Sequence, residues 1–239
     1  EAEARAVMPG IYDTATLHRP GVLRRSATWW QERRFLEAPF VRKGASRRRH
    51  VVAMRGGAPV GYVSYRHRGG LGGHNSAVEI VELLGVDHRA EATLWQFVMR
   101  MDLFPTVKWS NAPRDLALPW MVDDWRHIAR SCADNVWLRI DDVSKALAAR
   151  RYAVDGNLRF AVDGTTYELQ VHKGQGQCVA VQAAPEVTID RAALGSLYLG
   201  SVPALQLAAA GWLVGDAAVI ARAEALFAWP VAAWCPEIF

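Results

Sequence analysis

The sequence predicts an α+β fold made of two consecutive domains, residues 1–135 and 136–239. Two patterns support this prediction. Each half of the chain contains a pair of β-rich segments joined by a glycine-containing turn, and each half also contains helical segments. The chain has 239 residues, of which 51% are hydrophobic, so it is long enough to bury one large or two modest cores.

The first half contains an amphipathic pattern between Pro20 and Glu37, which predicts a helix with Ser26 as its N-cap. Residues 50–55 and 60–66 are β-rich and flank a Gly-Gly turn, which is typical of a β-hairpin. The first half therefore predicts a helix followed by a hairpin.

A further strand is predicted over residues 78–86, where apolar residues alternate near Glu79 and Glu82. Residues 90–101 predict a helix, because four apolar residues in this segment share one helical face. The order of elements in the first half is thus hairpin, loop, strand and helix.

The second half begins with a predicted helix over 143–150, which Asp141 or Asp142 can cap. Residues 158–162 and 167–171 predict a second hairpin around an Asp-Gly turn, and 178–182 a third strand. The rest is predicted to be helical and to contain three helices. The first starts at Thr188 or Asp190, and the second has Pro203 in its first turn. The third is capped by Asp216 and ends at Trp229-Pro230.

The charge of the chain favours an anionic ligand only weakly. The formal net charge of +4 comes from 28 basic and 24 acidic residues. The densest basic run, residues 47–50, precedes an apolar strand, and such runs are usually solvated loops. No zinc-finger, helix-turn-helix or RNA-recognition pattern accompanies it, so we expect no nucleic-acid partner.

The cysteines and histidines predict neither disulfides nor a metal site. Cys132, Cys178 and Cys235 are widely spaced and odd in number. The seven histidines lack the spacing of metal ligands, so we expect no metal. The longest apolar stretch, 202–214, is too short to cross a bilayer. We therefore expect a cytoplasmic protein without a membrane partner.

Several motifs together resemble a known family. They are Arg19-Pro20-Gly21-Val22 followed by Trp29-Trp30, the hairpin end Val60-Gly61-Tyr62, and Trp137-Leu138-Arg139-Ile140-Asp141-Asp142-Val143 leading to Arg150-Arg151-Tyr152. With the final helices, they resemble the second GNAT-like domain of the Eis (enhanced intracellular survival) N-acetyltransferases and the sterol-carrier-protein-like domain that follows it. The resemblance covers essentially the whole chain.

The resemblance implies a degenerate GNAT-like domain over 1–135 and a sterol-carrier-protein-like domain over 136–239. Family members carry an acetyl-CoA-binding GNAT domain ahead of these two, and no such segment precedes Glu1. We therefore expect this chain alone to be inactive and to need that N-terminal domain as a partner. The family also implies a homo-oligomer, typically a hexamer.

The start of the helix predicted over 90–101 lacks the features of a CoA site. A working GNAT domain binds the CoA pyrophosphate on backbone N–H groups of an Arg/Gln-x-x-Gly-x-Gly/Ala loop, because glycines let the backbone approach phosphate. The matching register here is Arg89-Ala90-Glu91-Ala92-Thr93-Leu94. Ala92 and Leu94 add side chains at the glycine positions, and Glu91 would repel the phosphates by about a few kcal/mol. We expect no cofactor at this site.

The chain end is the most informative segment. From Trp229 to Phe239 it has two Trp, two Pro and a closing Phe, which favours docking in a groove. In the Eis family the terminal carboxylate is the general base that removes a proton from the substrate amine, and Phe239 matches in type and position. A free α-carboxyl has a pKa of about 3.3 to 3.7, so burial or Glu237 nearby would have to raise it. The alternative is a packing strap without chemistry.

The resemblance implies a cationic substrate, an aminoglycoside or a similar polyamine, and such a substrate needs acidic walls. The candidates are Asp123, Asp124 and Glu237. Asp124-Trp125-Arg126 resembles the family's Asp-x-Arg at the pocket mouth, so Asp124 is the preferred substrate carboxylate, with a helix cap as its alternative role. Glu237, two residues from the expected base, is the second. The Trp29-Trp30 pair could stack on sugar rings, although such a pair more often packs in a core.

The resemblance thus implies acetyl transfer from acetyl-CoA to primary amines by direct attack in a ternary complex. This chain would supply pocket walls and the general base. The family assigns the acid that protonates the leaving thiolate to a tyrosine of the N-terminal domain, so we assign that role to no tyrosine here. The alternative function is a lipid- or small-molecule-binding protein without enzymatic activity, because the Ala/Leu-rich helices over 194–227 could enclose a ligand.

Overall fold

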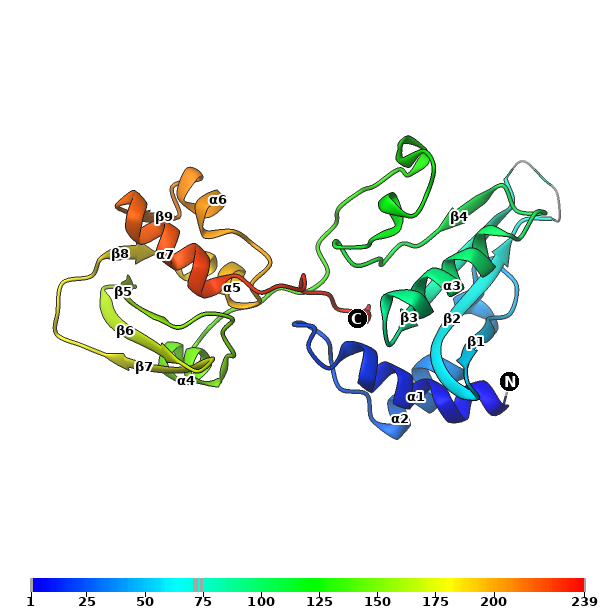
Figure 1. Cartoon of the computed structure of the whole chain (residues 1–239), viewed down its shortest axis with the longest axis horizontal. Helices are drawn as coiled ribbons and strands as arrows, with labels where there is room; N and C mark the ends of the chain where they lie inside the picture. Colours follow the sequence, from blue (N-terminus) through cyan, green and yellow to red (C-terminus); the bar gives the residue numbers. More distant parts are fainter. Residues whose placement is uncertain (1, 71–72, 74, 239) are drawn as a thin grey trace. The chain divides into compact units, whose positions relative to one another are not determined.

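The computed structural model describes residues 2–70, 73 and 75–238. The chain divides into two units (Figure 1). Unit 1 comprises the chain up to Ser131 and again from Pro236, and unit 2 comprises Cys132–Cys235. Each unit combines a β-sheet with helices, which confirms the predicted α+β fold class. The predicted domain ranges did not include the return of the C-terminal segment to unit 1.

Unit 1 is built on a four-stranded sheet in the order β1-β2-β3-β4. β1 (Arg49–Arg55), β2 (Ala58–Arg68) and β3 (Ala77–Gly85) are antiparallel neighbours, and β4 (Thr106–Lys108) pairs with β3 in parallel. The glycines at the β1–β2 turn have φ angles of +57° and +80°, which side chains disfavour. This backbone requirement explains why the Gly-Gly turn predicted the hairpin correctly.

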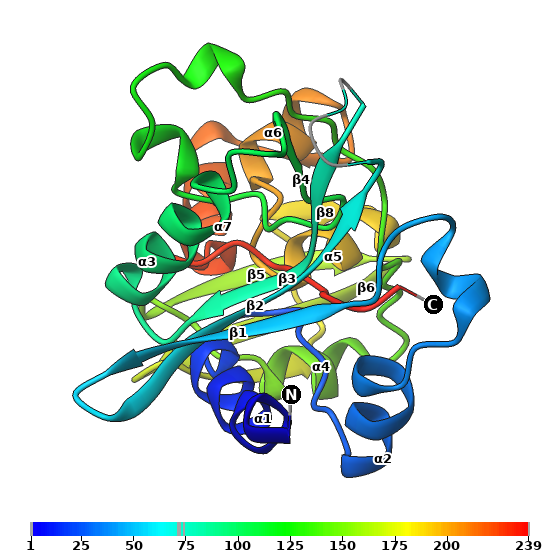
Figure 2. The same cartoon turned by 90° about the vertical axis from the view of Figure 1, so that its right-hand side faces the viewer.

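Helices cover both faces of the sheet in unit 1 (Figure 2). α3 (His88–Met99), predicted over 90–101, packs Leu94, Trp95 and Val98 into one apolar cluster with Val63 and Leu83 of the sheet. α1 (Ala2–Thr16), which was not predicted, contacts β1, β2 and β3 from the other side. The site described below lies on the α1 side.

The segment between Pro20 and Glu37 differs from the prediction of one helix. Only its middle is helical: α2 (Ala27–Trp29) continues into the π-helix η1 (Trp30–Phe35). Ser26 caps this segment as predicted, because its hydroxyl accepts a hydrogen bond from the Trp29 N–H at 3.1 Å. A π-helix is bonded from i to i+5, so residues five apart come to one side. The buried Trp30 and Phe35 rings accordingly stack with centroids 5.4 Å apart.

Unit 2 contains a five-stranded sheet in the order β7-β6-β5-β8-β9. β5 (Gly156–Val162) and β6 (Thr165–His172) form the predicted hairpin, and β7 (Gln175–Ala180) begins three residues before the predicted third strand. Two unpredicted strands of three residues, β8 (Val187–Ile189) and β9 (Leu213–Gly215), complete the sheet.

Four helices pack with this sheet: α4 (Val143–Ala149), α5 (Arg191–Tyr198), α6 (Ala204–Ala209) and α7 (Ala217–Phe227). Asp142 and Asp190 cap α4 and α5 through their carboxylates, as predicted. Pro203 lies at the N-cap of α6 rather than in its first turn, and Asp216 occupies the N-cap of α7 without a side-chain capping bond. The three predicted helices of this region are therefore confirmed, but the prediction that the whole region is helical was wrong, because β8 and β9 also lie within it.

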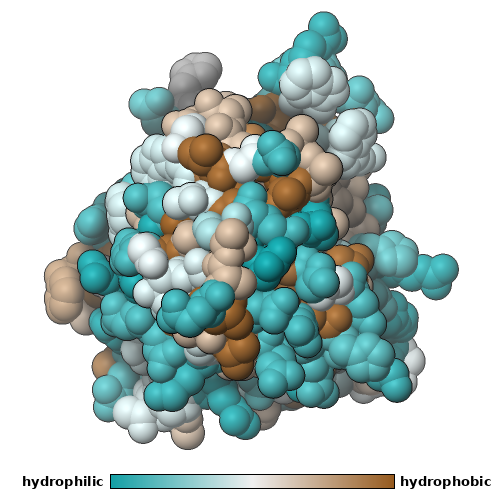
Figure 3. All heavy atoms as spheres, turned by 90° about the vertical axis from the view of Figure 1, so that its left-hand side faces the viewer, coloured by the Kyte–Doolittle hydropathy of each residue, from teal (hydrophilic) through white to brown (hydrophobic). Residues whose placement is uncertain are grey.

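The core of unit 2 lies between its sheet and helices and is filled by fully buried aliphatic and aromatic side chains, including Leu158, Phe160, Leu169, Leu194 and Leu197. The face of the molecule drawn in Figure 3 is mostly hydrophilic, with apolar residues in small patches. In the part of the chain that the structure describes, no helix combines the length and apolar character that a membrane span requires.

Candidate functional site

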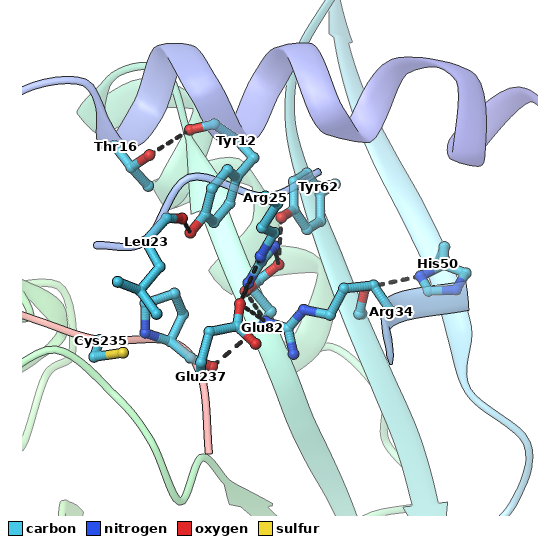
Figure 4. Close-up of polar contacts among 12 residues, drawn as sticks. Tyr12, Thr16, Leu23, Arg25, Arg34, His50, Tyr62, Glu82, Cys235 and Glu237 are labelled. Carbon is cyan, nitrogen blue, oxygen red and sulfur yellow. Dashed lines mark hydrogen bonds and ion pairs between the residues drawn. The ribbon is translucent and has the colours of Figure 1, made fainter. Parts of the chain in front are cut away.

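Four charged side chains lie together in unit 1, three of them buried and the fourth, Arg34, partly buried (Figure 4). They are Arg25 from the segment before α2, Arg34 from η1, Glu82 from β3, and Glu237 from the C-terminal segment. We call these four residues the buried ion cluster. Their side chains are between 1% and 12% exposed, and charged groups are rarely buried to this extent unless they are paired.

Glu82 is the centre of the buried ion cluster. Its carboxylate accepts two hydrogen bonds from Arg25, Nη1 to Oε2 at 3.0 Å and Nη2 to Oε1 at 2.6 Å. Arg34 and the hydroxyl of Tyr62 donate to the same carboxylate. β-strand alternation explains the geometry: Glu82 lies opposite Ser64 of β2, and Tyr62, two residues before Ser64, points to the same face of the sheet.

The electrostatics of the cluster fix the protonation of Glu82. Burial, the largest effect, raises its pKa, but Arg34 and Arg25 outweigh burial and hold the pKa at about 2. Burial and the charge of Glu82 raise the pKa of Tyr62 well above its ordinary value. Glu82 is therefore ionised and Tyr62 protonated near neutral pH, so these two groups are suited to holding a structure rather than to exchanging protons.

Arg25 is held by stacking as well as by charge. Its Cζ lies 3.8 Å from the centroid of the Tyr12 ring and 4.7 Å from that of Trp30. The Tyr12 hydroxyl donates to the carbonyl of Leu23 at 2.9 Å, which fixes the ring. Trp30 is thus buried beside the cluster. This agrees with packing in a core, the more usual role of such a Trp pair, rather than with stacking on a sugar ring.

The C-terminal segment joins the cluster through Glu237. Its Oε1 accepts a hydrogen bond from Arg25 Nε at 2.6 Å and lies 3.8 Å from Arg34 Nη2. Arg34 Nη2 also donates to the carbonyl of Pro236 at 3.5 Å. Residues 234–237 are buried, as the Trp- and Pro-rich composition of the chain end indicated. Phe239, the predicted general base, lies outside the described residues.

Asp124 has a different environment. Its carboxylate accepts hydrogen bonds from the Arg126 backbone N–H at 3.0 Å and from the Arg126 guanidinium at 2.9 Å and 3.0 Å. These hydrogen bonds lower its pKa. The side chain thus caps the short 3-10 helix η4 (Trp125–His127), and it is only partly buried. Capping was the alternative role for Asp124, and substrate binding by Asp124 stays a prediction.

A hollow of about 400 Å³ lies in the same segment of unit 1, lined by Pro119, Trp120, Trp125, Ile128 and Arg130. Its lining is mainly apolar and includes Trp120 and Trp125, which are 90% and 65% exposed. The predicted substrate carboxylates therefore lie in different surroundings: Asp124 at the N-cap of η4, next in sequence to Trp125 of the hollow, and Glu237 in the buried ion cluster. Glu237 as a substrate ligand also stays a prediction.

The start of α3 does not fit the pyrophosphate of acetyl-CoA. Asp87 occupies the N-cap, and its carboxylate accepts a hydrogen bond from the Ala90 N–H at 2.9 Å. Gly85 packs against the first turn of α3 so closely that a Cβ at this position would lie 2.6 Å from the Glu91 backbone nitrogen. Glu91 is half-buried, and burial raises its pKa. The backbone donors that would hold phosphate are thus shielded by the chain's own carboxylates and by close packing.

Metal ligation finds no support in the residues described. Among them, no three or more His, Cys, Asp or Glu side chains come together as a metal site would require.

The sequence prediction missed Arg25, Arg34, Tyr12 and Glu82 as members of a site. One signal was present, because Glu82 places a charge between the apolar pairs Ile80-Val81 and Leu83-Leu84 of a predicted strand. A buried carboxylate needs a cation, but the sequence did not show which of 28 basic residues would supply it.

The order of domains defines the class of protein. Residues 21–140 match the family of acetyltransferase (GNAT) domains, and residues 143–236 match the sterol carrier protein domain. The chain therefore belongs to the GNAT acetyltransferase family and carries a sterol-carrier-like domain after its GNAT domain. This confirms the predicted fold of both parts.

Named relatives point to the Eis type within this family. The chain is 32% identical over 234 residues to N-acetyltransferase Eis of Mycobacterium tuberculosis, covering 95% of this chain and 55% of that protein. It is 30% identical over 239 residues to an uncharacterized N-acetyltransferase of Streptomyces coelicolor, covering 96% of this chain and 58% of that one. The chain thus spans a little under three fifths of these curated relatives.

Solved structures agree with this assignment. Eis1 from Mycobacterium abscessus superimposes with a TM-score of 0.80 at 25% identity, covering 100% of this chain and 60% of that one. A GCN5-related N-acetyltransferase from Anabaena variabilis, with a TM-score of 0.77 at 20% identity over 98% of this chain and 60% of that one, shares the fold. The resemblance to Eis-type acetyltransferases is therefore confirmed for family and domain order.

Proposed function

We propose that this chain takes part in acetyl transfer from acetyl-CoA to primary amines of aminoglycosides or similar polyamines. The observation that carries the proposal is the burial of the C-terminal segment in the GNAT-like unit, where Glu237 is paired with Arg25. The pairing of Glu237 holds the segment that leads to Phe239, and this supports a chemical role for that segment. The likeness to Eis-type relatives supports the choice of reaction.

In this proposal the terminal carboxylate of Phe239 is the general base. It takes a proton from the substrate nitrogen, whose lone pair attacks the acetyl carbonyl carbon. The C–S bond of the thioester then breaks, and CoA leaves as a thiol protonated by the acid that the family resemblance assigns to the N-terminal domain. The pKa of a free α-carboxyl, about 3.3 to 3.7, is low for this task, so the proposal requires an environment that raises it. Asp124 and Glu237 are proposed to attract the cationic substrate.

The proposal assigns acetyl-CoA to a further GNAT domain, ahead of unit 1, which the family resemblance implies. The capped start of α3 supports this assignment, because it leaves no cradle for phosphate at that position in unit 1. Residues 1–239 alone are then inactive and bind acetyl-CoA poorly. A cytoplasmic location and a homo-oligomer, a hexamer by family resemblance, belong to the same proposal.

The general-base role is tested in the complete gene product by appending one glycine after Phe239. This change keeps every side chain and the negative charge but moves the carboxylate by one residue. Since general bases contribute about 10²- to 10⁴-fold, kcat should fall by at least about 100-fold, measured as CoA thiol release with an aminoglycoside acceptor. Phe239→Leu is the matched control and should keep most activity. Equal rates for the extended and native proteins would refute the base.

Two further measurements test the other assignments. Asp124→Asn should raise the KM for the polycationic acceptor several-fold and leave the KM for acetyl-CoA unchanged, and an unchanged acceptor KM would contradict the role of Asp124. Calorimetric titration of residues 1–239 with acetyl-CoA should show no tight binding. Micromolar or tighter binding would show that the acetyl donor site lies within this chain.

The alternative function, lipid binding without catalysis, is favoured by the match to the sterol carrier protein domain. Against it, the space between the sheet and helices of unit 2 is filled by its own side chains, such as Phe160 and Leu197. Native mass spectrometry distinguishes the two functions, because lipid binding predicts a co-purified ligand of constant mass.

A further inference from the structure

The clearest feature that the proposed reaction does not use is the buried ion cluster itself. Glu237 is 4% exposed, and a carboxylate is rarely buried to this extent unless cations balance its charge. A buried carboxylate at this position implies a site that was built to receive it.

Arg25 is that site, and most of its contacts are to residues outside the C-terminal segment, which from here on we call the tail. Its two terminal nitrogens are held by Glu82, and its plane is held between the rings of Tyr12 and Trp30. The remaining donor, Nε–H, points to Glu237 Oε1 at 2.6 Å. One edge of the guanidinium group therefore binds Glu82 of the sheet, and the other edge binds Glu237 of the tail.

Charge balance within the cluster adds to this argument. Without Glu237, the two guanidinium groups of Arg25 and Arg34 face one carboxylate, that of Glu82, in a buried site. Glu237 supplies the second negative charge and makes the four groups neutral together. Since an unbalanced buried charge is unfavourable, the cluster favours the docked tail over the released tail. Arg34 also contacts the tail backbone through the Pro236 carbonyl.

We propose that Arg25, clamped by Glu82, is a positioning residue that fastens the C-terminal segment through Glu237. The docking follows from the contacts above, and its catalytic consequence rests on the proposed function of the Phe239 carboxylate. In this proposal Glu237 anchors the segment through the hydrogen bond from Arg25 to its Oε1, and this role replaces the substrate-binding role considered for Glu237 above.

Tail release measures the docking directly and does not depend on activity. Wild-type protein and Glu237→Gln are digested with a carboxypeptidase under native conditions, and the loss of C-terminal residues is followed by intact-mass spectrometry. Glu237→Gln keeps the shape of the side chain and leaves the Arg25–Glu82 pair intact, so the unit should stay folded. We expect trimming past position 237 to be at least ten times faster than in the wild type.

Arg25→Met is the second variant, and Arg55→Met is its matched control, since Arg55 pairs with Asp87 in the same unit at the surface. Arg25→Met should accelerate trimming as Glu237→Gln does, whereas Arg55→Met should trim at the wild-type rate. Trimming of Glu237→Gln at the wild-type rate would overturn the anchor, whatever the activity of the variant.

The positioning role has its own readout in the complete gene product. Glu237→Gln should lower kcat at least ten-fold and leave the KM for acetyl-CoA within two-fold, a separation that general destabilisation would not produce. If the glycine extension abolishes turnover but Glu237→Gln does not, the positioning role is wrong and the base stands. If neither the glycine extension nor Glu237→Gln affects turnover, the general-base role of Phe239 is wrong. Faster trimming of Glu237→Gln would then still support Glu237 as the anchor of the tail.

Discussion

Replacing Glu82 with glutamine removes the central negative charge of the buried ion cluster and keeps the shape of the side chain. The pKa of Glu82 is held at about 2, against an ordinary value of 4.5. At about 1.4 kcal/mol for each pKa unit, this difference corresponds to about 3 kcal/mol of folding free energy. Removing one partner from a buried ion pair typically costs about 3 to 5 kcal/mol. We therefore expect Glu82→Gln to lower the stability of unit 1 by about 3 to 5 kcal/mol at pH 7.

The pH dependence of stability follows from the same values. Because the pKa of Glu82 is lower in the folded chain than in the unfolded chain, its contribution is complete above about pH 4.5 and is lost as the pH falls toward 2. The wild type should therefore lose about 3 kcal/mol more than Glu82→Gln over this interval. The difference between the two proteins should shrink on acidification.

Hydrogen exchange of the β2 and β3 amides in increasing urea reports the stability of unit 1 separately from that of unit 2. The matched control is Glu79→Gln on the same strand, whose pair with Arg68 is partly exposed. Such a pair contributes less than about 1 kcal/mol. Equal losses in the two variants, or a Glu82→Gln deficit that persists at pH 2.5, would refute the reasoning.

Three further predictions concern packing and helix ends. Gly195→Ala should destabilise unit 2 by about 2 kcal/mol in urea unfolding, because a Cβ there would lie within 3.0 Å of the Leu138 carbonyl oxygen, and a neutral result would contradict this contact. Gly10→Ala should stabilise unit 1 by about 0.5 to 1 kcal/mol, since the added methyl meets open space in α1, and a lower urea midpoint would be inconsistent with a helical Gly10. Arg150→Met should cost unit 2 about 2 kcal/mol or more, because the guanidinium donates to the carbonyls of Tyr198, Leu226 and Phe227, and an unchanged thermal midpoint would disprove that these bonds matter.

Elements with a local cause were predictable. Both long hairpins depend on positive φ at the turn, which Gly56 and Gly57 supply in unit 1, and Asp163 and Gly164 in unit 2. The caps at Ser26, Asp142 and Asp190 likewise depend on residues within three positions of the helix start. Such signals lie close together in the sequence, so they could be interpreted without the tertiary structure.

Elements with a distant cause were not predictable. α1 contains Pro9 and Gly10, which disfavour helices, and it is stabilised by packing on the sheet through Met8 and Tyr12. β4 and β8 have three residues each and exist as strands because they pair in parallel with β3 and β5. A three-residue segment carries too little periodicity to reveal such a partner.

The candidate site shows the same limit more strongly. The buried ion cluster joins positions 25, 34, 82 and 237, which lie on four separate elements. The composition of the tail indicated that it docks, and the family resemblance suggested the role of Phe239. Neither could identify Arg25 as the contact, because an arginine in an irregular segment is normally expected at the surface.

The return of the last residues to unit 1 has a consequence for how the protein is made. Ribosomes deliver the N-terminal part of a chain first, so β1 to β4 emerge long before Glu237 does. Until Glu237 has been synthesised, Arg25 and Arg34 share one carboxylate, so unit 1 completes its charge balance only after the whole of unit 2 has been made. Nascent chains arrested ahead of Glu237 should therefore hold a less stable first unit.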